Sequence, residues 1–523
     1  MTKLILPIVV LSMVNSLWAE VKLPAIFSDN MMLQQDLAVP VWGSADPGEN
    51  VAISVAGKEV KTVADAKGKW RAKLSPLKAD GQPITMTVTG KNSITVKNVL
   101  VGEVWLGSGQ SNMQMALRNV TNAAAEMASA NYPDIRIFTL KRRGAPQPLE
   151  DFEGEWVSAT AGGIEKFSAV LYFFGRDLHA SIKQPIGLIN SSYGGTKIEW
   201  WLRLEALMSD PQSAKEAELR IKELDDPAWV EAQYAKDLVR YEKEVETAKA
   251  EGRRPKLGKP QKIGPEAKSR HGGLYNAMIH PLLGYGIRGF LWYQGEFNAD
   301  KAEQYGRLFP KMITDWREQW GLGELPFFFV QLPPISGLQN EPMLYRGVTG
   351  WAELREVQAK TLSLPNTGMA VTIDTAADGD LHPKDKQPVG NRLARLAANQ
   401  VYGLPIPCQA PMFAGMERKG EAVRLKFSQA EGGLVTREGG AVAGFAISGE
   451  DRKFVWAEAR IEGEQVIVSS PAVKEPVAVR YAWANHPVIS LFNRNGLPLA
   501  PFRTDDWLTT SKDEKKGNVK SKP

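Results

Sequence analysis

Short apolar runs alternate with amphipathic stretches through the middle of the chain. The apolar runs have the length of buried strands and cover residues 103–106, 186–190, 289–293, 327–331 and 369–373. The stretches with helical spacing lie among these runs and after the last of them, at residues 168–178, 305–320, 351–362 and 385–401. Strand–helix alternation is typical of an α/β fold, so we expect a mainly parallel sheet that is covered by helices on both faces.

Period-two alternation of apolar and polar residues takes over on either side of this region. It occurs at residues 51–55, 70–74 and 84–88, and again at 423–427, 466–468 and 477–481. The pattern predicts a small β-sandwich over residues 20–100 and a second β-rich module over residues 406–508. We therefore expect the α/β domain to occupy residues 101–405.

Residues 203–270 interrupt the strand–helix alternation. Within them an apolar stripe with helical spacing predicts one long helix; its members are Tyr234, Leu238, Tyr241 and Val245. A helical hairpin packed on the domain is the simpler interpretation, and a lid over a pocket is the alternative. Residues 252–270 are rich in Pro and Lys, and we expect them to form a solvated connector.

The two ends of the chain have the composition of processing and tail segments. Lys3, an apolar stretch over residues 4–14 and a small-residue site near residue 19 predict a cleavable signal peptide over residues 1–19. The protein is therefore expected to be secreted or periplasmic. The apolar stretch is too short to cross a bilayer and no later run is long enough, so we expect no membrane span. Residues 509–523 are rich in Lys and are expected to be disordered.

The net charge of +5 comes from two short segments. Residues 252–270 and 511–523 carry net charges of +6 and +3, so the remainder of the chain is slightly acidic. This distribution gives no basic binding face and argues against a nucleic-acid partner. Cys408 is the one cysteine, which excludes intramolecular disulfides and zinc sites of the CxxC type. The sequence gives no indication of the oligomeric state.

Unusual polar segments follow the apolar strands of the middle region. In open α/β sheets, sites form beyond the carboxyl ends of strands. The first such segment, residues 107–113, is Gly-rich and precedes a helix-compatible stretch, so it could expose the hydroxyl of Ser111 as a nucleophile. Ser111 or Ser108 could instead only cap that helix. The segment does not match GxSxG, because Met113 occupies the last glycine position.

Two further segments offer groups that could bind an oxyanion. Gly194 and Gly195 follow the strand at residues 186–190, and paired glycines let backbone N–H groups approach a ligand closely. Gln294, Glu296 and Asn298 follow the strand at residues 289–293. A side-chain amide there could face an oxyanion, or the segment could be a polar surface loop that Asn298 caps.

The fourth segment contains a histidine beside carboxylates. His382 follows the strand at residues 369–373, and Asp378 and Asp380 precede it closely. Such a histidine can act as a general base that an acid orients. These three side chains could also bind a metal ion, but they lack the spacing that metal ligands generally have. Together, the four segments supply a nucleophile, oxyanion donors, a base and an orienting acid.

These segments resemble the sialate O-acetylesterase family of SGNH-type carbohydrate esterases. The blocks that carry the resemblance are Gly109-Gln-Ser-Asn-Met113, Gly194-Gly-Thr196, Tyr293-Gln-Gly-Glu296 and His382-Pro383. Further family-like phrases occur at residues 23–31, 274–278 and 497–505, so the resemblance covers nearly the whole mature chain.

The resemblance implies a three-layer α/β/α hydrolase domain that removes O-acetyl groups from sugars without a metal or cofactor. By matching motif, Ser111 is the nucleophile and His382 the base. The oxyanion hole would consist of the N–H of Ser111, the N–H of Gly194 or Gly195, and a side-chain amide. The alternatives are an esterase for acetylated xylan or another acetylated polysaccharide, and a carbohydrate-binding protein without catalysis.

The chain departs from the wider SGNH pattern at two positions. The pattern places an Asp three residues before the His, where this chain has Gly379, so the acid would be Asp380 or Asp378. A Ser–His dyad held by a backbone carbonyl is the third arrangement. The pattern also places an Asn two residues after a Gly, where this chain has Phe297. Gln294 is the expected substitute and Asn298 the second choice, with Glu296 in a supporting role.

Two questions about the sugar also arise from the sequence. Trp200, Trp201 and Trp292 are candidates for stacking on sugar rings, although burial is the commoner fate of tryptophan. Arg355 is a candidate for binding the carboxylate of a sialic acid.

Overall fold

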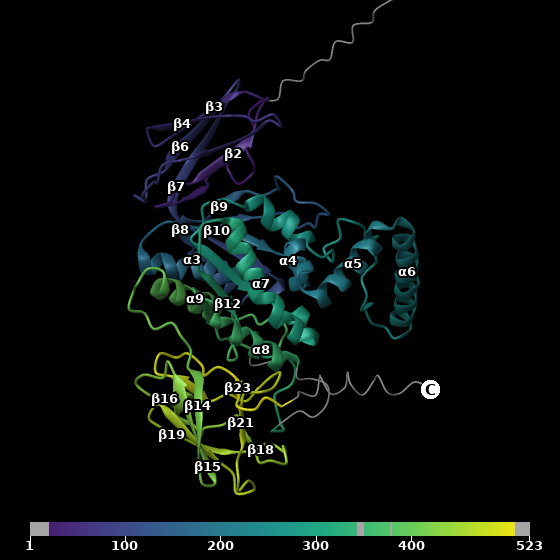
Figure 1. Ribbon diagram of the computed structural model, residues 1–523, viewed down its shortest axis with the longest axis vertical. Coiled ribbons are helices and arrows are strands. Elements are labelled where there is room, and N and C mark those ends of the chain that lie inside the picture. Colours follow the sequence, from purple (N-terminus) through teal and green to yellow (C-terminus); the bar gives the residue numbers. More distant parts are fainter. Residues whose placement is uncertain (1–19, 343–349, 377–378, 508–523) are drawn as a thin grey trace, which may run out of the picture.

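The protein has a mixed α/β fold with one large central sheet and further β-rich sheets at both ends (Figure 1). This computed structural model describes residues 20–342, 350–376 and 379–507. The expected signal peptide (1–19), the Lys-rich tail (509–523) and Asp378 lie outside these residues. No helix in the described part of the chain is long and apolar enough to cross a membrane.

Seven strands form the central path of the large sheet. In order they are β13 (Thr367–Ala370), β12 (Phe327–Val330), β11 (Gly289–Tyr293), β7 (Ser93–Gly109), β10 (Ile186–Ser192), β8 (Asn131–Thr139) and β9 (Trp156–Thr160). Neighbours from β13 to β8 pair in parallel, and β9 pairs antiparallel with β8 at the edge. The carboxyl ends of the parallel strands therefore meet at one edge of the sheet, where the polar segments follow.

Helices cover the two faces of this sheet. On one face α3 (Ala169–Ile182) packs beside α9 (Gln387–Gln400), and Phe174 of α3 contacts Trp105 of β7. On the other face lie α7 (Ala302–Trp320) and α8 (Gly350–Lys360), and Trp316 of α7 contacts Phe290 of β11. The buried strands are apolar on both faces because each face packs against helices. A short helix, α2 (Ala123–Ser129), precedes β8.

Strand β7 belongs to two parts of the fold. Its first half pairs antiparallel with β6 (Ile84–Thr89), and its last seven residues pair with β10. The remaining N-terminal strands are β1 (Met32–Gln34), β2 (Pro40–Ser44), β3 (Asn50–Val55), β4 (Lys58–Val63) and β5 (Lys69–Lys73). The expected boundary between residues 100 and 101 lies inside β7, so one continuous strand joins the N-terminal sheet to the central one.

The C-terminal region forms three small antiparallel sheets. The first contains β14 (Met412–Lys419), β15 (Ala422–Ser428), β20 (Gln465–Ser469) and β19 (Glu458–Glu462). The second contains β18 (Val455–Trp456), β17 (Phe445–Ser448), β21 (Ala478–Tyr481) and β23 (Phe502–Arg503). The third pairs β16 (Leu434–Thr436) with β22 (Leu491–Asn493).

Arg355 of α8 ties the C-terminal region to the central domain. Its guanidinium is fully buried and donates to the carbonyl oxygens of Leu332 and Pro333 and to those of Ala484 and Asn485. Since all of its nitrogens are used for backbone carbonyls, Arg355 is a structural residue. Arg355 was a candidate for binding the carboxylate of a sialic acid, and these hydrogen bonds leave none of its nitrogens for that role.

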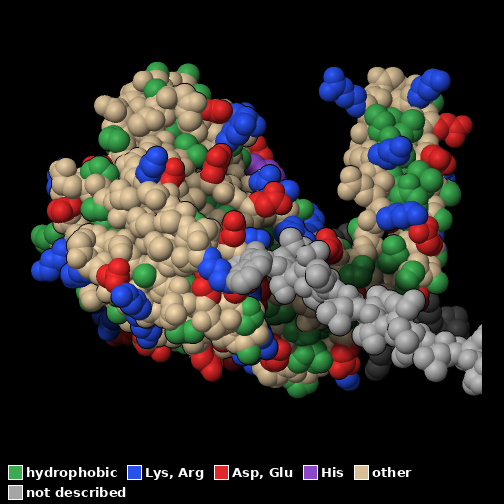
Figure 2. Space-filling model, turned by 90° about the horizontal axis from the view of Figure 1, so that it is seen from above, with side chains coloured by type: hydrophobic (Ala, Val, Ile, Leu, Met, Phe, Trp, Pro, Cys, Tyr) green, Lys and Arg blue, Asp and Glu red, His purple; other side chains and the backbone are tan. Residues whose placement is uncertain are grey.

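The insertion after β10 is helical, as its apolar stripe predicts. It contains α4 (Leu204–Met208), α5 (Pro211–Asp225) and α6 (Pro227–Ala250). Two ion pairs join the starts of α5 and α7: Asp210, the N-cap of α5, pairs with Arg307 of α7, and Glu216 of α5 pairs with Lys301, the N-cap of α7. Helix α6 stands away from the body of the protein as an arm (Figures 1 and 2), and Ala248 is its one buried residue.

Candidate functional site

Ser111 lies where the central strand β7 turns into a helix. The strand ends at Gly109, whose φ of +131° and close approach to Tyr293 exclude a side chain: a Cβ there would lie 2.2 Å from the carbonyl oxygen of Tyr293. The N–H of Gln110 donates to that same oxygen at 3.0 Å. The chain then enters α1 (Ser111–Gln114), so the hydroxyl of Ser111 stands at the carboxyl edge of the sheet.

The imidazole of His382 contacts this hydroxyl. Nε2 of His382 lies 2.7 Å from Oγ of Ser111, although the two residues are 271 positions apart. Both side chains are partly exposed. Ser108, the other hydroxyl of the segment, is buried and its Oγ has no hydrogen-bond partner in the described part of the chain. Of the two serines that the sequence offers, Ser111 is thus the one that meets a histidine.

Asp380 holds the backbone turn in front of His382. Its Oδ1 accepts a hydrogen bond of 3.0 Å from the N–H of His382. Burial lowers the pKa of the His382 imidazole below its usual 6.5; the positive charge of Lys386 acts in the same direction, and Asp380 opposes the shift. Asp378, the alternative acid, is outside the described residues.

Gly194 and Gly195 lie beside Ser111. A Cβ on Gly194 would come within 3.3 Å of the Ser111 Cβ. The N–H of Gly194 donates to Oε1 of Gln114 at 2.6 Å, so this N–H is already used. In the residues that the structure describes, the N–H of Gly195 has no hydrogen-bond partner.

Gln294 and Asn298 form hydrogen bonds with the segment that follows the Gly194–Gly195 turn. The Nε2 of Gln294 donates to the carbonyl oxygen of Thr196 at 3.0 Å and to Oδ1 of Asn298 at 2.8 Å. Oδ1 of Asn298 also accepts from the N–H of Ile198, and its Nδ2 donates to Glu199. Both amide protons of Gln294 are therefore committed, which differs from the expected direct donation to an oxyanion.

A buried polar network, which the sequence did not indicate, connects the serine and histidine segments. Nδ2 of Asn112 donates to Glu296 Oε1 at 2.5 Å and to the carbonyl oxygen of Leu381 at 3.0 Å. Oδ1 of Asn112 accepts from Nζ of Lys386 at 2.5 Å. Burial raises the pKa of Glu296 and lowers that of Lys386 to about 7. Asn112 thus ties the helix of Ser111 to the loop of His382.

Two apolar side chains are exposed next to this network. Phe297, which follows Glu296, is 48% exposed, and Leu381, which precedes His382, is 40% exposed. The three tryptophans proposed from the sequence are buried, and Trp201 packs edge-on against Trp292. Burial, the commoner fate of tryptophan, is thus what the structure shows for all three, and their packed faces leave none of them to stack on a sugar.

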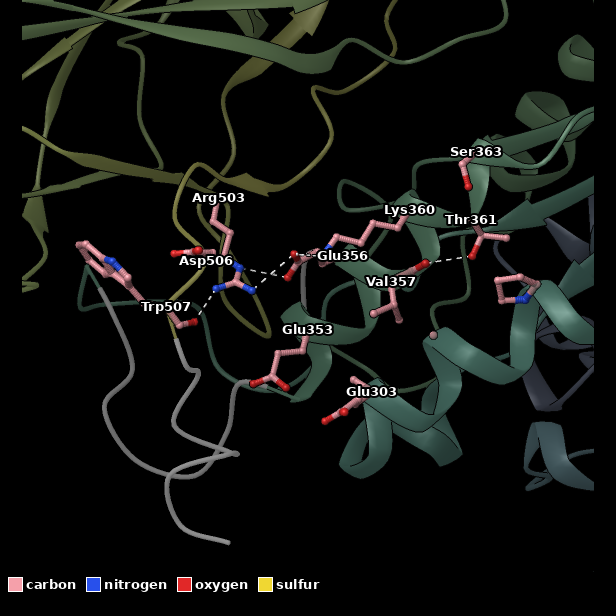
Figure 3. Close-up of a pocket in the computed structure, with 13 residues that line it drawn as sticks. Glu303, Glu353, Glu356, Val357, Lys360, Thr361, Ser363, Arg503, Asp506 and Trp507 are labelled. Atoms are coloured by element: carbon pink, nitrogen blue, oxygen red, sulfur yellow. Dashed lines mark hydrogen bonds and ion pairs between the residues drawn. The ribbon is translucent and has the colours of Figure 1, made fainter. Parts of the chain in front are cut away.

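A separate cavity of about 450 Å³ lies between α7, α8 and the segment after β23 (Figure 3). Glu356 and Arg503 form an ion pair of 3.1 Å in its wall, and Trp507 closes one side. Neither Ser111 nor His382 lines this cavity, so it is not part of the site described above.

Comparisons with known proteins agree on one class of enzyme. Residues 264–399 match the family model described as carbohydrate esterase, sialic acid-specific acetylesterase. The sialate O-acetylesterase of Rattus norvegicus is 32% identical over 88% of this chain and 90% of its own length, and that of Mus musculus is 30% identical over the same shares. The crystal structure of a carbohydrate acetylesterase from Xanthomonas citri superposes with a TM-score of 0.77 at 36% identity, covering 93% of this chain and all of the other.

Proposed function

The chain belongs to the sialate O-acetylesterase family of carboxylic ester hydrolases, and from this premise we propose that it removes O-acetyl groups from sugars with Ser111 as nucleophile and His382 as general base. The observation that supports these roles is the distance of 2.7 Å between Oγ of Ser111 and Nε2 of His382. A nucleophile within hydrogen-bond reach of its base is the arrangement that covalent ester hydrolysis requires.

The reaction would proceed in two acyl-transfer steps. Oγ of Ser111 attacks the acetyl carbonyl carbon while His382 takes the hydroxyl proton, and a tetrahedral oxyanion forms. The sugar oxygen then leaves with that proton, and the acetyl group stays on Ser111. Water attacks this acetyl-serine, His382 again accepts a proton, and acetate leaves as the Ser111 hydroxyl is restored.

The oxyanion is proposed to bind the N–H groups of Ser111 and Gly195. Gly195 is preferred to Gly194 because the N–H of Gly194 donates to Gln114. Gln294 and Asn298 are assigned an indirect role, since their hydrogen bonds hold the segment Thr196–Ile198 that follows the glycines. Donors that are fixed before the reaction stabilise the developing charge without having to reorganise.

Asp380 is proposed as the acid that supports His382, because it is in the same turn and accepts from the N–H of that residue. Asp378 and a dyad without an acid are the other two arrangements. Around this site we propose an SGNH-type three-layer domain over residues 101–405, with accessory β-rich modules at 20–100 and 406–508. Export is proposed from the charged and apolar pattern of residues 1–19.

The pH dependence of the reaction follows from the state of His382. Only the neutral imidazole can accept the Ser111 proton, so activity is lost as pH falls through the pKa of His382. Because burial lowers that pKa below 6.5, we expect kcat/KM to rise along an acidic limb centred below pH 6.5 and to be level at neutral pH. A pH profile with a neutral acetyl ester measures this; a limb centred above pH 7 would contradict it.

Acetate release from a panel of acetylated sugars tests the proposed function. We expect release from O-acetylated sialic acid by the wild-type protein. Release from acetylated xylan alone would replace sialate by the polysaccharide alternative. Saturable binding of the same sugars with no release of acetate from any of them would favour a carbohydrate-binding protein and would overturn the esterase assignment.

A further inference from the structure

Two side chains bond to the backbone of Gly194, one to its N–H and one to the carbonyl oxygen of the peptide group that joins it to Gly195. The preceding N–H, that of Gly194, donates to Oε1 of Gln114 at 2.6 Å. The carbonyl oxygen of Gly194 accepts from Nζ of Lys268 at 3.1 Å. Lys268 belongs to the insertion of residues 203–270, so this hydrogen bond joins the insertion to the Gly194–Gly195 turn.

This carbonyl and the N–H of Gly195 belong to the same peptide unit. In a planar trans peptide they point in opposite directions, so fixing the oxygen also fixes the direction of the N–H. Glycine on both sides leaves the flanking dihedral angles free, and Gly195 has a φ of +63°. Glycine therefore imposes little steric barrier to a flip of this peptide unit. After a flip, the carbonyl oxygen of Gly194 would point where the N–H of Gly195 had pointed, and this oxygen would repel an oxyanion.

The position of Lys268 suits it to prevent such a flip. Its ammonium lies over the ring of Tyr193, 5.1 Å from the ring centre, and burial lowers its pKa. In the described part of the chain it forms no ion pair with a carboxylate. The half-buried ammonium of Lys268 therefore depends on the carbonyl oxygen of Gly194, and not on a carboxylate, for a polar contact.

Helix α5 in turn positions the segment that contains Lys268. Nη2 of Arg220 donates to Oγ of Ser269 at 2.9 Å, and Arg270 pairs with Asp225 at 2.6 Å. Since α5 is itself paired with α7, a continuous series of polar contacts links the base of the inserted arm to Gly194.

We propose that Lys268 is a positioning residue that holds the Gly194–Gly195 peptide in the orientation needed for the oxyanion hole. The inference rests on the proposed function, which it deepens by giving the base of the insertion a role in catalysis. Lys268 acts through the backbone and does not touch the reacting atoms, so it affects every ester that Ser111 attacks.

Kinetics with p-nitrophenyl acetate, a small neutral ester, test the proposal. We expect Lys268→Met to lower kcat by roughly 10- to 100-fold with little change in KM, which is less than the roughly 100- to 1,000-fold cost of deleting an oxyanion donor. Lys268→Arg keeps a donor for the Gly194 carbonyl and is expected to restore most of the loss. Lys262→Met is the matched control, because Lys262 is exposed and pairs with Glu231 away from the turn.

Two outcomes would overturn the proposal. The first is wild-type kcat for Lys268→Met on the neutral ester. The second is a defect confined to the KM of an acidic ester such as O-acetylated sialic acid, since that pattern would make Lys268 a ligand of the substrate carboxylate. A thermal melt of each variant separates either result from loss of folding.

Labelling by a fluorophosphonate gives a second readout that needs no sugar substrate. Oγ of Ser111 forms a bond to phosphorus, the P–F bond breaks, fluoride leaves, and His382 accepts the hydroxyl proton. The phosphoryl oxygen then occupies the position of the oxyanion. We expect slower labelling of Lys268→Met by intact mass, rescue in Lys268→Arg and no labelling of Ser111→Ala.

The two readouts distinguish the failure of this proposal from failure of the proposed function. If the wild-type protein is labelled at Ser111 but releases no acetate from any sugar, the sugar assignment fails and the effect of Lys268 is still measurable. If Lys268→Met is labelled and turns over like the wild type, the role of Lys268 is rejected and the esterase assignment stands.

Discussion

Ser111→Ala should abolish release of acetate, lowering kcat by roughly a thousandfold or more. The substitution removes the hydroxyl that lies 2.7 Å from Nε2 of His382, and no other hydroxyl of the described residues forms a hydrogen bond with that imidazole. Binding of the sugar should persist, because the removed oxygen takes part in the reaction and contributes little to holding the rest of the substrate. Initial rates of acetate release and a binding isotherm on the same variant measure the two effects separately.

Ser108→Ala is the matched control for this experiment. Ser108 is three residues away in the same segment, is buried and has an Oγ without a partner. Removing an unsatisfied hydroxyl is expected to leave kcat unchanged and not to lower stability. Equal acetate release by Ser111→Ala and the wild type would refute the assignment of the nucleophile.

His382→Ala is expected to lower kcat by roughly a thousandfold or more as well, because Ser111 then has no group to accept its proton. The acidic limb of the pH profile should disappear with the imidazole. Added imidazole is expected to recover part of the activity, since the deleted ring leaves space beside a partly exposed Ser111. Measurement of kcat against imidazole concentration checks this.

His179→Gln serves as the control for the histidine. His179 is in α3, where its Nδ1 lies 2.7 Å from the carbonyl oxygen of Gln184, away from the site. Its kcat and pH profile should match those of the wild type. A His382→Ala variant that keeps its acidic limb would show that a different group titrates, and the base would have to be reassigned.

The sequence predicted the strands of the central path from β13 to β10, but not β8 and β9 beyond them. The apolar runs at 186–190 and 289–293 coincide with β10 and β11, because strands that are buried on both faces consist of continuous runs of apolar residues. Strand β8 was not predicted, because Pro133 and Asp134 interrupt its apolar pattern. The helical insertion was predicted from its stripe, whereas its separation from the body depends on tertiary contacts that the pattern does not encode.

The candidate site was predictable in its members but not in their connections. Ser111 and His382 were recognisable because each follows a strand in a polar segment of a family-like motif. That Asn112 joins Glu296 to the loop of His382 depends on three segments meeting in space. The hydrogen bond from the Gln294 amide to the carbonyl oxygen of Thr196 could not be predicted either, because the sequence does not say whether a side-chain amide faces a ligand or the backbone.

The sharing of β7 between two sheets has a consequence for how this architecture can vary. An extended strand advances by about 3.3 Å per residue and turns successive side chains to opposite sides. Inserting or deleting one residue near Gly102 would therefore move each side chain between that point and the end of β7 to the opposite face of the strand, relative to the N-terminal half of β7. If recombination exchanges the N-terminal sheet, the number of residues in β7 can therefore change only in steps of two. The N-terminal sheet thus constrains the position of the segment that carries Ser111.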